Sequence, residues 1–160
     1  MTLEEATHDG PYLAMDIAVV QRYLHDHIPL SKAMEVEVLE ATESGVKLAA
    51  PLAPNINHRE TVFGGSASAV AILSAWTLIY LRLQSVRINA RIVIQRNTMS
   101  YERPITGAFS ASAAIPEAAW RRFAEALRRK SRGRVAVNSV LCCAAEKVAT
   151  FEGDFVAWIL

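Results

Sequence analysis

The sequence predicts an α+β protein in which an antiparallel β-sheet wraps around one long central helix. Residues 62–81 contain no charged side chain over twenty positions, which is typical of a helix that is buried on every side. Most of the second half of the chain alternates apolar and polar residues, as half-buried strands do. A sheet needs a cover for its apolar face, and only this helix is apolar enough to be enclosed by it.

The composition indicates one soluble domain over residues 1–160, with residues 1–12 as a flexible N-terminal segment. The chain has 160 residues, of which 52% are hydrophobic and 21% charged, enough for one core. A formal net charge of +1 argues against a nucleic acid partner. The N-terminus lacks the basic and apolar parts of a signal peptide, so we expect a cytoplasmic protein.

The two cysteines, Cys142 and Cys143, are neighbours in a predicted strand. Neighbouring side chains of a strand point to opposite faces, so we expect no disulfide between them. We also expect no metal site, because no metal-ligand partners lie at a zinc-type spacing from any histidine; these are His8, His25, His27 and His58.

A membrane span is the alternative interpretation of residues 62–81, because about 20 apolar residues cross a bilayer. The first part of this run is only weakly hydrophobic, with Ser66, Ser68 and Ser74 spread along it. Arg82 follows without the cluster of cations that orients a membrane helix. We therefore expect a helix buried in its own protein and no membrane partner.

The N-terminal part predicts a helix and a pair of strands. Residues 13–26 place apolar side chains at helical spacing, and Pro29 stops this helix. Residues 33–41 alternate as a half-buried strand does. A turn at Gly45 leads into a second strand, which prolines end near residues 51–54.

The rest of the chain predicts the central helix at 65–83, then strands with one more helix between them. The helix at 116–133 begins with Pro116, gathers cations at its end and has Gly133 as a cap. The last two strands are expected to join near residues 146–147. The expected strands cover residues 88–104, 106–116, 134–148 and 149–160.

Several motifs resemble one known family. They are APLAPNIN at 50–57, TVFGGS at 61–66, Trp76, SYERP at 100–104, RGRVAVNSVLC at 132–142 and FEGDFVA at 151–157. The arrangement resembles the hotdog fold of acyl thioesterases, and the motifs are similar to those of the YiiD C-terminal thioesterase-like family. This resemblance implies a homodimer whose sheets join edge to edge, with thioester sites at the subunit interface. It also implies acyl-CoA or acyl carrier protein as substrate, with CoA or phosphopantetheine as part of the substrate and no other cofactor.

Two features of hotdog thioesterases are missing from this sequence. A His-Gly-Gly turn opens the central helix in the family, and Phe63 stands in place of that histidine. The family also carries a helix carboxylate that activates water, and the corresponding stretch from Ile72 to Ser74 holds no acid. Hydrolysis is therefore less firmly implied than a thioester substrate.

The glycine pair Gly64 and Gly65 is the first candidate for catalysis. A helix N-terminus presents unpaired N–H groups and a partial positive charge, and glycines let a ligand approach the backbone. Such N–H groups would stabilise an oxyanion or enolate, with Asn57 as a third polar group. The alternative is that the glycines serve packing and that Asn57 shapes the loop.

Other residues are assigned to substrate binding or left open. His58 and Glu60 are local candidates for a general base, although they are equally expected in a solvated turn. Seven of the fourteen residues at 121–134 are cations, which would dock an acidic carrier or CoA phosphates, or form a solvated face. The residues that we assign to substrate binding are Phe63, Ser66, Asn97, Thr98, Ser100, Tyr101, Arg128, Arg129 and Lys130.

Three functions remain open at this point. The first is a thioesterase of fatty acid metabolism that hydrolyses acyl-CoA or acyl carrier protein thioesters. The second is decarboxylation of a malonyl group on acyl carrier protein, an activity associated with members of the YiiD-like family. It needs an enolate stabiliser but no helix carboxylate. The third is an acyl-thioester or acyl-carrier binding module without turnover.

Overall fold

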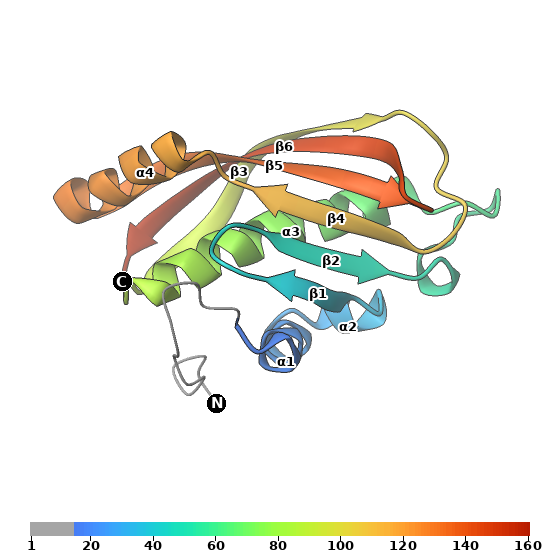
Figure 1. The fold of residues 1–160 in the computed structure, drawn as a ribbon, viewed down its shortest axis with the longest axis horizontal. Coiled ribbons are helices and arrows are strands. Elements are labelled where there is room, and N and C mark those ends of the chain that lie inside the picture. The colour runs from blue at the N-terminus through green and yellow to red at the C-terminus, as the bar shows by residue number, and fades with distance from the viewer. Residues whose placement is uncertain (1–14) are drawn as a thin grey trace.

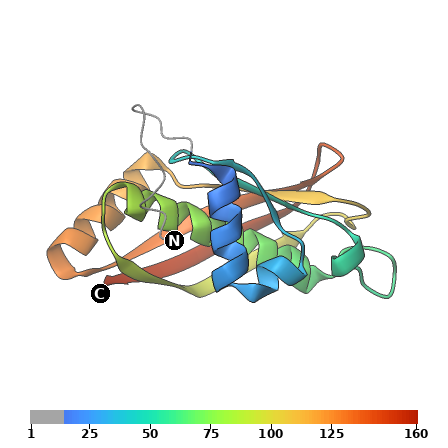
Figure 2. The same ribbon diagram turned by 90° about the horizontal axis from the view of Figure 1, so that it is seen from below.

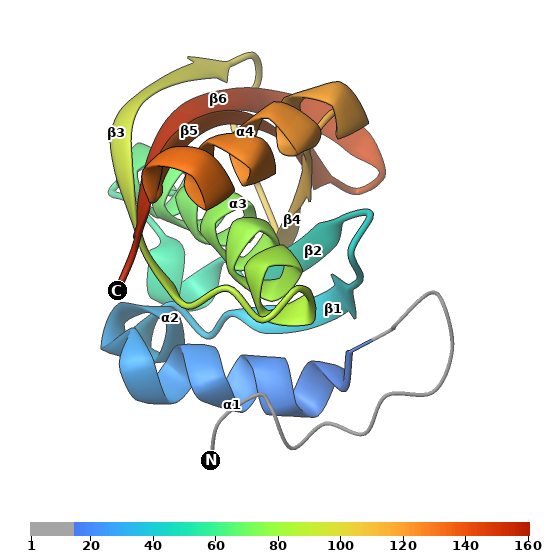
Figure 3. The same cartoon turned by 90° about the vertical axis from the view of Figure 1, so that its left-hand side faces the viewer.

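The structure, a computed structural model, describes residues 15–160, so the expected flexible segment at 1–12 lies outside the described residues. Six antiparallel strands form one sheet in the order β1-β2-β4-β5-β6-β3. This sheet curls around the long helix α3 (Figures 1 and 3), which confirms the predicted architecture. The strands are β1 Glu37–Ala41, β2 Val46–Ala50, β3 Ala90–Tyr101, β4 Phe109–Ala114, β5 Arg132–Cys143 and β6 Glu146–Ile159.

Helix α3, Gly64–Ser85, is the centre of the core. Eleven of its 22 residues are buried, and they occur on all sides of the helix. The helix is long and apolar enough to cross a membrane, because an 18-residue stretch of it has a mean hydropathy of 1.4. However, 61% of this stretch is buried inside the protein. Its apolar surface is therefore used by the sheet and by the other helices.

Three shorter α-helices complete the fold: α1 Ile17–His27, α2 Pro29–Ala33 and α4 Glu117–Lys130. A 3₁₀ helix, Ala53–Asn55, lies in the loop before α3. Seen from below, α1 crosses α3 on the side away from the sheet (Figure 2). The rings of Tyr23 in α1 and Tyr80 in α3 stack there, with 5.0 Å between their centroids. α4 packs against the C-terminal end of α3, where Arg82 lies 4.3 Å from the centre of the Trp120 ring.

The sequence missed several local features. Pro29 ends α1 as predicted, but it also begins α2, because proline is well suited to the first position of a helix. Glu35 then takes a φ of 56°, so the first strand begins at Glu37 rather than at 33. The turn between β5 and β6 falls at Ala144 and Ala145, which both have positive φ and carry none of the usual turn signals.

The predicted cap at Gly133 is wrong. Ser131 takes the left-handed conformation that ends α4, and Gly133 lies inside β5. A Cβ atom at Gly133 would lie 3.0 Å from both the ring and the carbonyl oxygen of Phe123, so the glycine makes room for α4 on the sheet. Cys142 and Cys143 are both free, as predicted.

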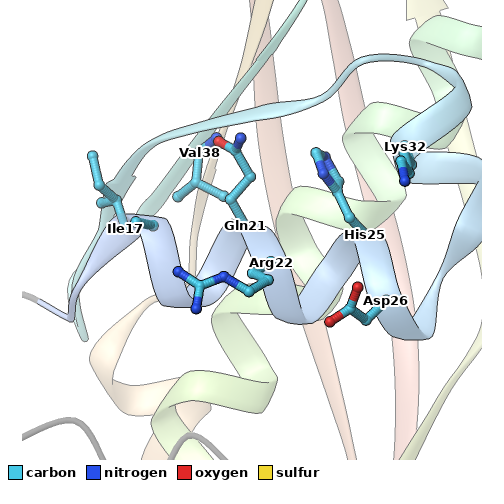
Figure 4. A pocket seen from close by; sticks show the side chains of 8 residues that line it. Ile17, Gln21, Arg22, His25, Asp26, Lys32 and Val38 are labelled. Carbon is cyan, nitrogen blue, oxygen red and sulfur yellow. The ribbon is translucent and has the colours of Figure 1, made fainter. Parts of the chain in front are cut away.

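The two edges of the sheet differ. At the β1 edge, Gln21 Oε1 accepts a hydrogen bond from Val38 N at 3.0 Å, and His25 Nε2 lies 2.8 Å from the Val36 carbonyl oxygen. Met15 N donates to Ala41 O at 3.0 Å on the same edge. Figure 4 shows Gln21 and His25 pointing from α1 towards this strand, over a cavity of about 470 Å³. β3 forms the other edge and pairs only with β6 within the described chain.

We predict that α1 protects the β1 edge from other chains. Replacing Gln21 and His25 together by alanine leaves two backbone groups without their partners, which should lower the free energy of unfolding by about 1–3 kcal/mol. Urea denaturation measures this loss, and light scattering should reveal species larger than those of the parent. Arg22→Ala on the same helix removes neither bond and serves as the control. Unchanged stability and size in the double variant would contradict the prediction.

Candidate site at the start of the central helix

The loop before α3 is anchored by Asn55. This residue is 2% exposed, and its Nδ2 donates to the carbonyl oxygens of Met34 at 3.0 Å and Pro51 at 2.8 Å. Its own carbonyl oxygen accepts a hydrogen bond from Phe63 N at 2.7 Å. Asn55 thus ties the end of β2, the end of α2 and the start of α3 together. Sequence reasoning passed over it in favour of Asn57, because burial of a loop asparagine leaves no periodic signal.

Asn57 closes the turn that follows. Its Oδ1 accepts hydrogen bonds from Arg59 N at 2.8 Å and Thr61 N at 3.1 Å, and its Nδ2 donates to Thr61 Oγ1 at 2.8 Å. His58 and Glu60 lie exposed in this same turn. The side chain of Asn57 is therefore engaged mainly in shaping the loop, which leaves one Nδ2 hydrogen for a ligand.

The first two N–H groups of α3 are free. Phe63 is the N-cap residue and makes no side-chain hydrogen bond to the helix. Ser66 N and Ala67 N donate to the Phe63 carbonyl oxygen at 2.9 and 3.1 Å. Within residues 15–160, no acceptor pairs with the N–H of Gly64 or Gly65. The N-terminus of this 22-residue helix therefore presents two unpaired donors and a partial positive charge.

Two aromatic residues flank the glycine pair. The Tyr101 hydroxyl donates to the Gly64 carbonyl oxygen at 3.0 Å, which joins the end of β3 to the start of α3. The ring of Phe63, which is 59% exposed, lies where a side chain at Gly65 would be, so a Cβ atom there would collide with it. Gly65 is therefore required by a neighbouring ring as well as by any ligand.

A cavity of about 380 Å³ opens beside Gly64. Its walls come from the loop, from the start of α3 and from the SYERP motif. The charged residues in its lining are paired with the β5–β6 hairpin: Glu102 with Lys147 at 3.4 Å and Arg103 with Glu146 at 2.8 Å. The lining residues are Thr61, Val62, Gly64, Ala67, Tyr101, Glu102, Arg103, Pro104 and Ile105.

The strand residues assigned to substrate binding divide between two faces. Asn97 and Tyr101 lie on the face towards α3, because Tyr101 reaches Gly64 and the sheet alternates. Thr98 and Ser100 point to the opposite face of the same strand. Of the strand residues predicted for the site, the structure therefore brings only Tyr101 into contact with the glycine pair.

The predicted cations lie far from this end of the helix. Arg82 follows Gly64 by eighteen residues, or about 27 Å along the helix axis. Since Arg82 contacts Glu117 at 3.1 Å, α4 sits at the opposite end of α3. Arg128, Arg129 and Lys130 therefore do not contribute to the Gly64 site within the same chain.

The helix face beyond the glycine pair carries no acid. Ile72 lines a second, apolar cavity of about 250 Å³ together with Ala69, Leu73 and Trp76. Ser74 is fully buried and contacts Ser139, with 2.9 Å between the hydroxyl oxygens. Residues 15–160 contain no group of three or more His, Cys, Asp or Glu that could hold a metal ion.

Comparisons with known proteins agree on the fold. A family described as "Putative thioesterase (yiiD_Cterm)" has a model that matches residues 17–159. A solved protein of unknown function from Chlorobaculum tepidum is 26% identical, with a TM-score of 0.84 over 89% of this chain and 94% of that chain. A putative thioesterase from Shewanella oneidensis is 27% identical, with a TM-score of 0.80 over 89% and 96%. A Haemophilus influenzae thioesterase is 10% identical, with a TM-score of 0.74 over 92% and 94%, and shows the fold alone.

We predict that Phe63 and Gly65 are coupled in stability. Alanine has a higher helix propensity than glycine by up to about 1 kcal/mol, but at position 65 it meets the Phe63 ring. Gly65→Ala should therefore raise the free energy of unfolding in a Phe63→Ala background and lower it, or leave it unchanged, in the parent. Denaturant unfolding of the four proteins in this double-mutant cycle measures the coupling. Equal effects in both backgrounds would show that the ring does not occupy this space.

Proposed function

Because the chain belongs to the YiiD C-terminal putative thioesterase family and has the hotdog fold, we propose that it is an enzyme acting on acyl thioesters, with hydrolysis as its reaction. The substrate is an acyl group on CoA or on an acyl carrier protein. CoA or phosphopantetheine then enters as part of the substrate, and the proposal needs no other cofactor and no membrane. A cytoplasmic location suits both substrates.

One observation carries this proposal: the free N–H groups of Gly64 and Gly65 lie at the start of α3, beside a cavity that Gly64 lines. A thioester carbonyl gains negative charge on its oxygen when it is attacked, and preorganised N–H donors stabilise that charge. The glycine at position 65 is exposed, so a carbonyl oxygen has access to its backbone. Gly64 and Gly65 are therefore the proposed catalytic donors, and Asn57 in the preceding loop is proposed as a third donor.

The proposed enzyme is a homodimer that pairs through β3. This strand is 12 residues long and has one side without a hydrogen-bonded neighbour in the described chain, whereas the β1 edge is covered by α1. An open strand of this length invites pairing with a second copy. Pairing across β3 would put Tyr101 and the cavity beside Gly64 near the subunit boundary.

Hydrolysis also needs a group that activates water. The helix offers none, but Glu102 lines the cavity beside Gly64 and is only partly engaged, in a half-exposed ion pair with Lys147. A carboxylate next to the reacting carbonyl can accept a proton from water. We therefore assign this role to Glu102.

Decarboxylation of a malonyl thioester is the second candidate. It is favoured by the acid-free helix face from Ile72 to Ser74 and by Arg103, which lines the cavity beside Gly64. The same N–H groups would stabilise the enolate. Glu102 counts against it, because a carboxylate in the cavity repels the malonyl group. Hydrolysis therefore stands first.

We predict that Asn57→Ala lowers turnover by a factor of about 10²–10³, as loss of one oxyanion donor does. Asn57→Asp is the matched control, since its Oδ1 can still accept from Arg59 N and Thr61 N while the amide donor is lost. Steady-state kinetics on both variants separate the roles. If Asn57→Asp keeps full activity, Asn57 serves the loop and is not a catalytic donor.

We predict that Glu102→Gln lowers the rate of hydrolysis of a simple acyl thioester by a factor of at least about 10², because the proposed base is removed. Incubation of each protein with a simple acyl and a malonyl thioester, with products identified by mass, distinguishes the reactions. Free acid and thiol indicate hydrolysis, and an acetyl thioester with CO₂ indicates decarboxylation. Lys147→Gln removes only the ion-pair partner and is the control. Turnover of neither substrate by the parent would leave only a binding module.

We predict a dimer of about twice 17.6 kDa in solution, because an open 12-residue strand pairs with its copy. Light scattering at micromolar concentration measures the mass directly. A monomer under these conditions would contradict the proposed pairing through β3.

A further inference from the structure

One end of the molecule carries a local excess of positive charge. We name as the basic end its seven exposed cations: Arg121, Arg122, Arg128, Arg129, Lys130, Arg132 and Arg134. Within residues 15–160 only two of the seven form ion pairs, with Glu117 at 3.9 Å and Glu125 at 3.4 Å. The whole chain has 17 basic and 16 acidic residues, so the excess is confined to this end. A positive field therefore remains here despite the nearly neutral total.

The basic end is a ridge rather than a pocket. Trp120, Phe123 and Leu127 are buried, whereas the cations occupy the exposed side of α4 and the start of β5. Figures 1 and 3 show α4 standing at one end of the molecule. Cations spread along an exposed helix complement an extended acidic surface, whereas a single phosphate is best bound by converging donors. The shape therefore favours an acidic protein over the phosphates of a nucleotide.

A carrier docked on this ridge cannot reach the Gly64 site of the same protomer. α4 contacts Arg82, which lies about 27 Å along the axis of α3 from Gly64. A phosphopantetheine arm has roughly as many bonds as four to five residues of backbone, so it spans on the order of 15 Å. The arm of a carrier docked on α4 is therefore too short to reach Gly64 of the same protomer.

Pairing through β3 brings the ridge to the other site. Ser131, at the end of α4, accepts a hydrogen bond from Ile159 N at 2.9 Å, and Ile159 pairs with Ala90 of β3. The ridge thus ends about 10 Å, or two strand spacings, from the edge at Ala90. In an antiparallel pair of β3 strands, this end lies beside the Tyr101 end of the other copy, and Tyr101 touches Gly64. One further strand spacing brings the total to about 15 Å.

We propose that the basic end of one protomer docks an acidic acyl carrier protein and delivers its thioester to the Gly64 site of the other protomer. This inference rests on the proposed thioester function and dimer. It explains how the basic end and the glycine pair can serve one reaction although they lie at opposite ends of α3. Each site then consists of catalytic groups from one copy and a docking surface from the second.

The first test compares one acyl group on three carriers. Arg128→Glu, Arg129→Glu and Lys130→Glu together should raise the KM at least tenfold when the acyl group is on acyl carrier protein, and far less when it is on pantetheine. The difference should shrink at high salt, which screens exposed charges. Arg22→Glu with Lys32→Glu, a reversal on α1 and α2, is the control and should leave KM unchanged. An equal rise with acyl-CoA would overturn the carrier proposal in favour of nucleotide phosphates.

The second test uses mixed dimers. The charge-reversed variant is co-assembled with the less active of Asn57→Ala and Glu102→Gln, which keep the basic end. In a mixed dimer the intact ridge and the intact site lie on different copies, so delivery between copies restores turnover of the carrier-bound substrate. We expect about a quarter of the parent rate, since half of randomly assembled dimers are mixed and each has one competent pairing.

If the mixed preparation is no more active than the average of the two variants measured alone, delivery between copies is overturned. This outcome is distinct from failure of the proposed function, which would appear as no turnover of any acyl thioester by the parent. Activity of the parent on acyl-pantetheine, with no effect of charge reversal on the carrier-bound substrate at low salt, would overturn the docking surface alone. Arg128→Gln, Arg129→Gln and Lys130→Gln together provide a milder variant should the reversed protein misfold.

Discussion

The enclosure of α3 is the constraint on which the rest of the structure depends. A helix of 22 residues with one charged side chain must have its apolar surface covered, and the sheet, α1 and α4 each cover part of it. The sheet takes the largest share, Tyr23 of α1 stacks on Tyr80, and Trp120 of α4 packs against Arg82. Removing any one of these covers would expose part of this apolar surface to water.

This enclosure also determines where chemistry can occur. A buried helix has its backbone groups paired along its length, so polar backbone atoms emerge only at its ends. At the start of α3, Phe63 fails to cap the helix with a side chain, and two donors remain. Their position is fixed by the packing of α3 and by the Asn55 anchor rather than by a mobile side chain. The proposed catalytic donors are therefore as rigid as the core itself.

Periodicity predicted the large elements, and local exceptions to it were missed. The charge-free run gave α3 and the alternating segments gave the strands, because burial imposes these patterns on a sequence. The turn at Ala144 and Ala145 and the cap at Ser131 depend on positive φ at residues that rarely adopt it, so composition did not indicate them. The position of the glycine pair at the start of the central helix was predicted from the change to a charge-free run, and α3 begins at Gly64. The engagement of Asn57 within its own turn was left open by the sequence, since both roles suit an asparagine.

The cover that α1 places over β1 has a consequence for assembly. A sheet with two open edges behaves like a bifunctional monomer, and repeated pairing then yields fibres of indefinite length. With Gln21 and His25 occupying one edge, this sheet resembles the monofunctional monomer that polymer chemists add to stop chain growth. In the proposed dimer, a single pairing at β3 would use the only open edge in the described chain, and growth would stop at two copies. Two polar side chains on one short helix thus act as the chain stopper.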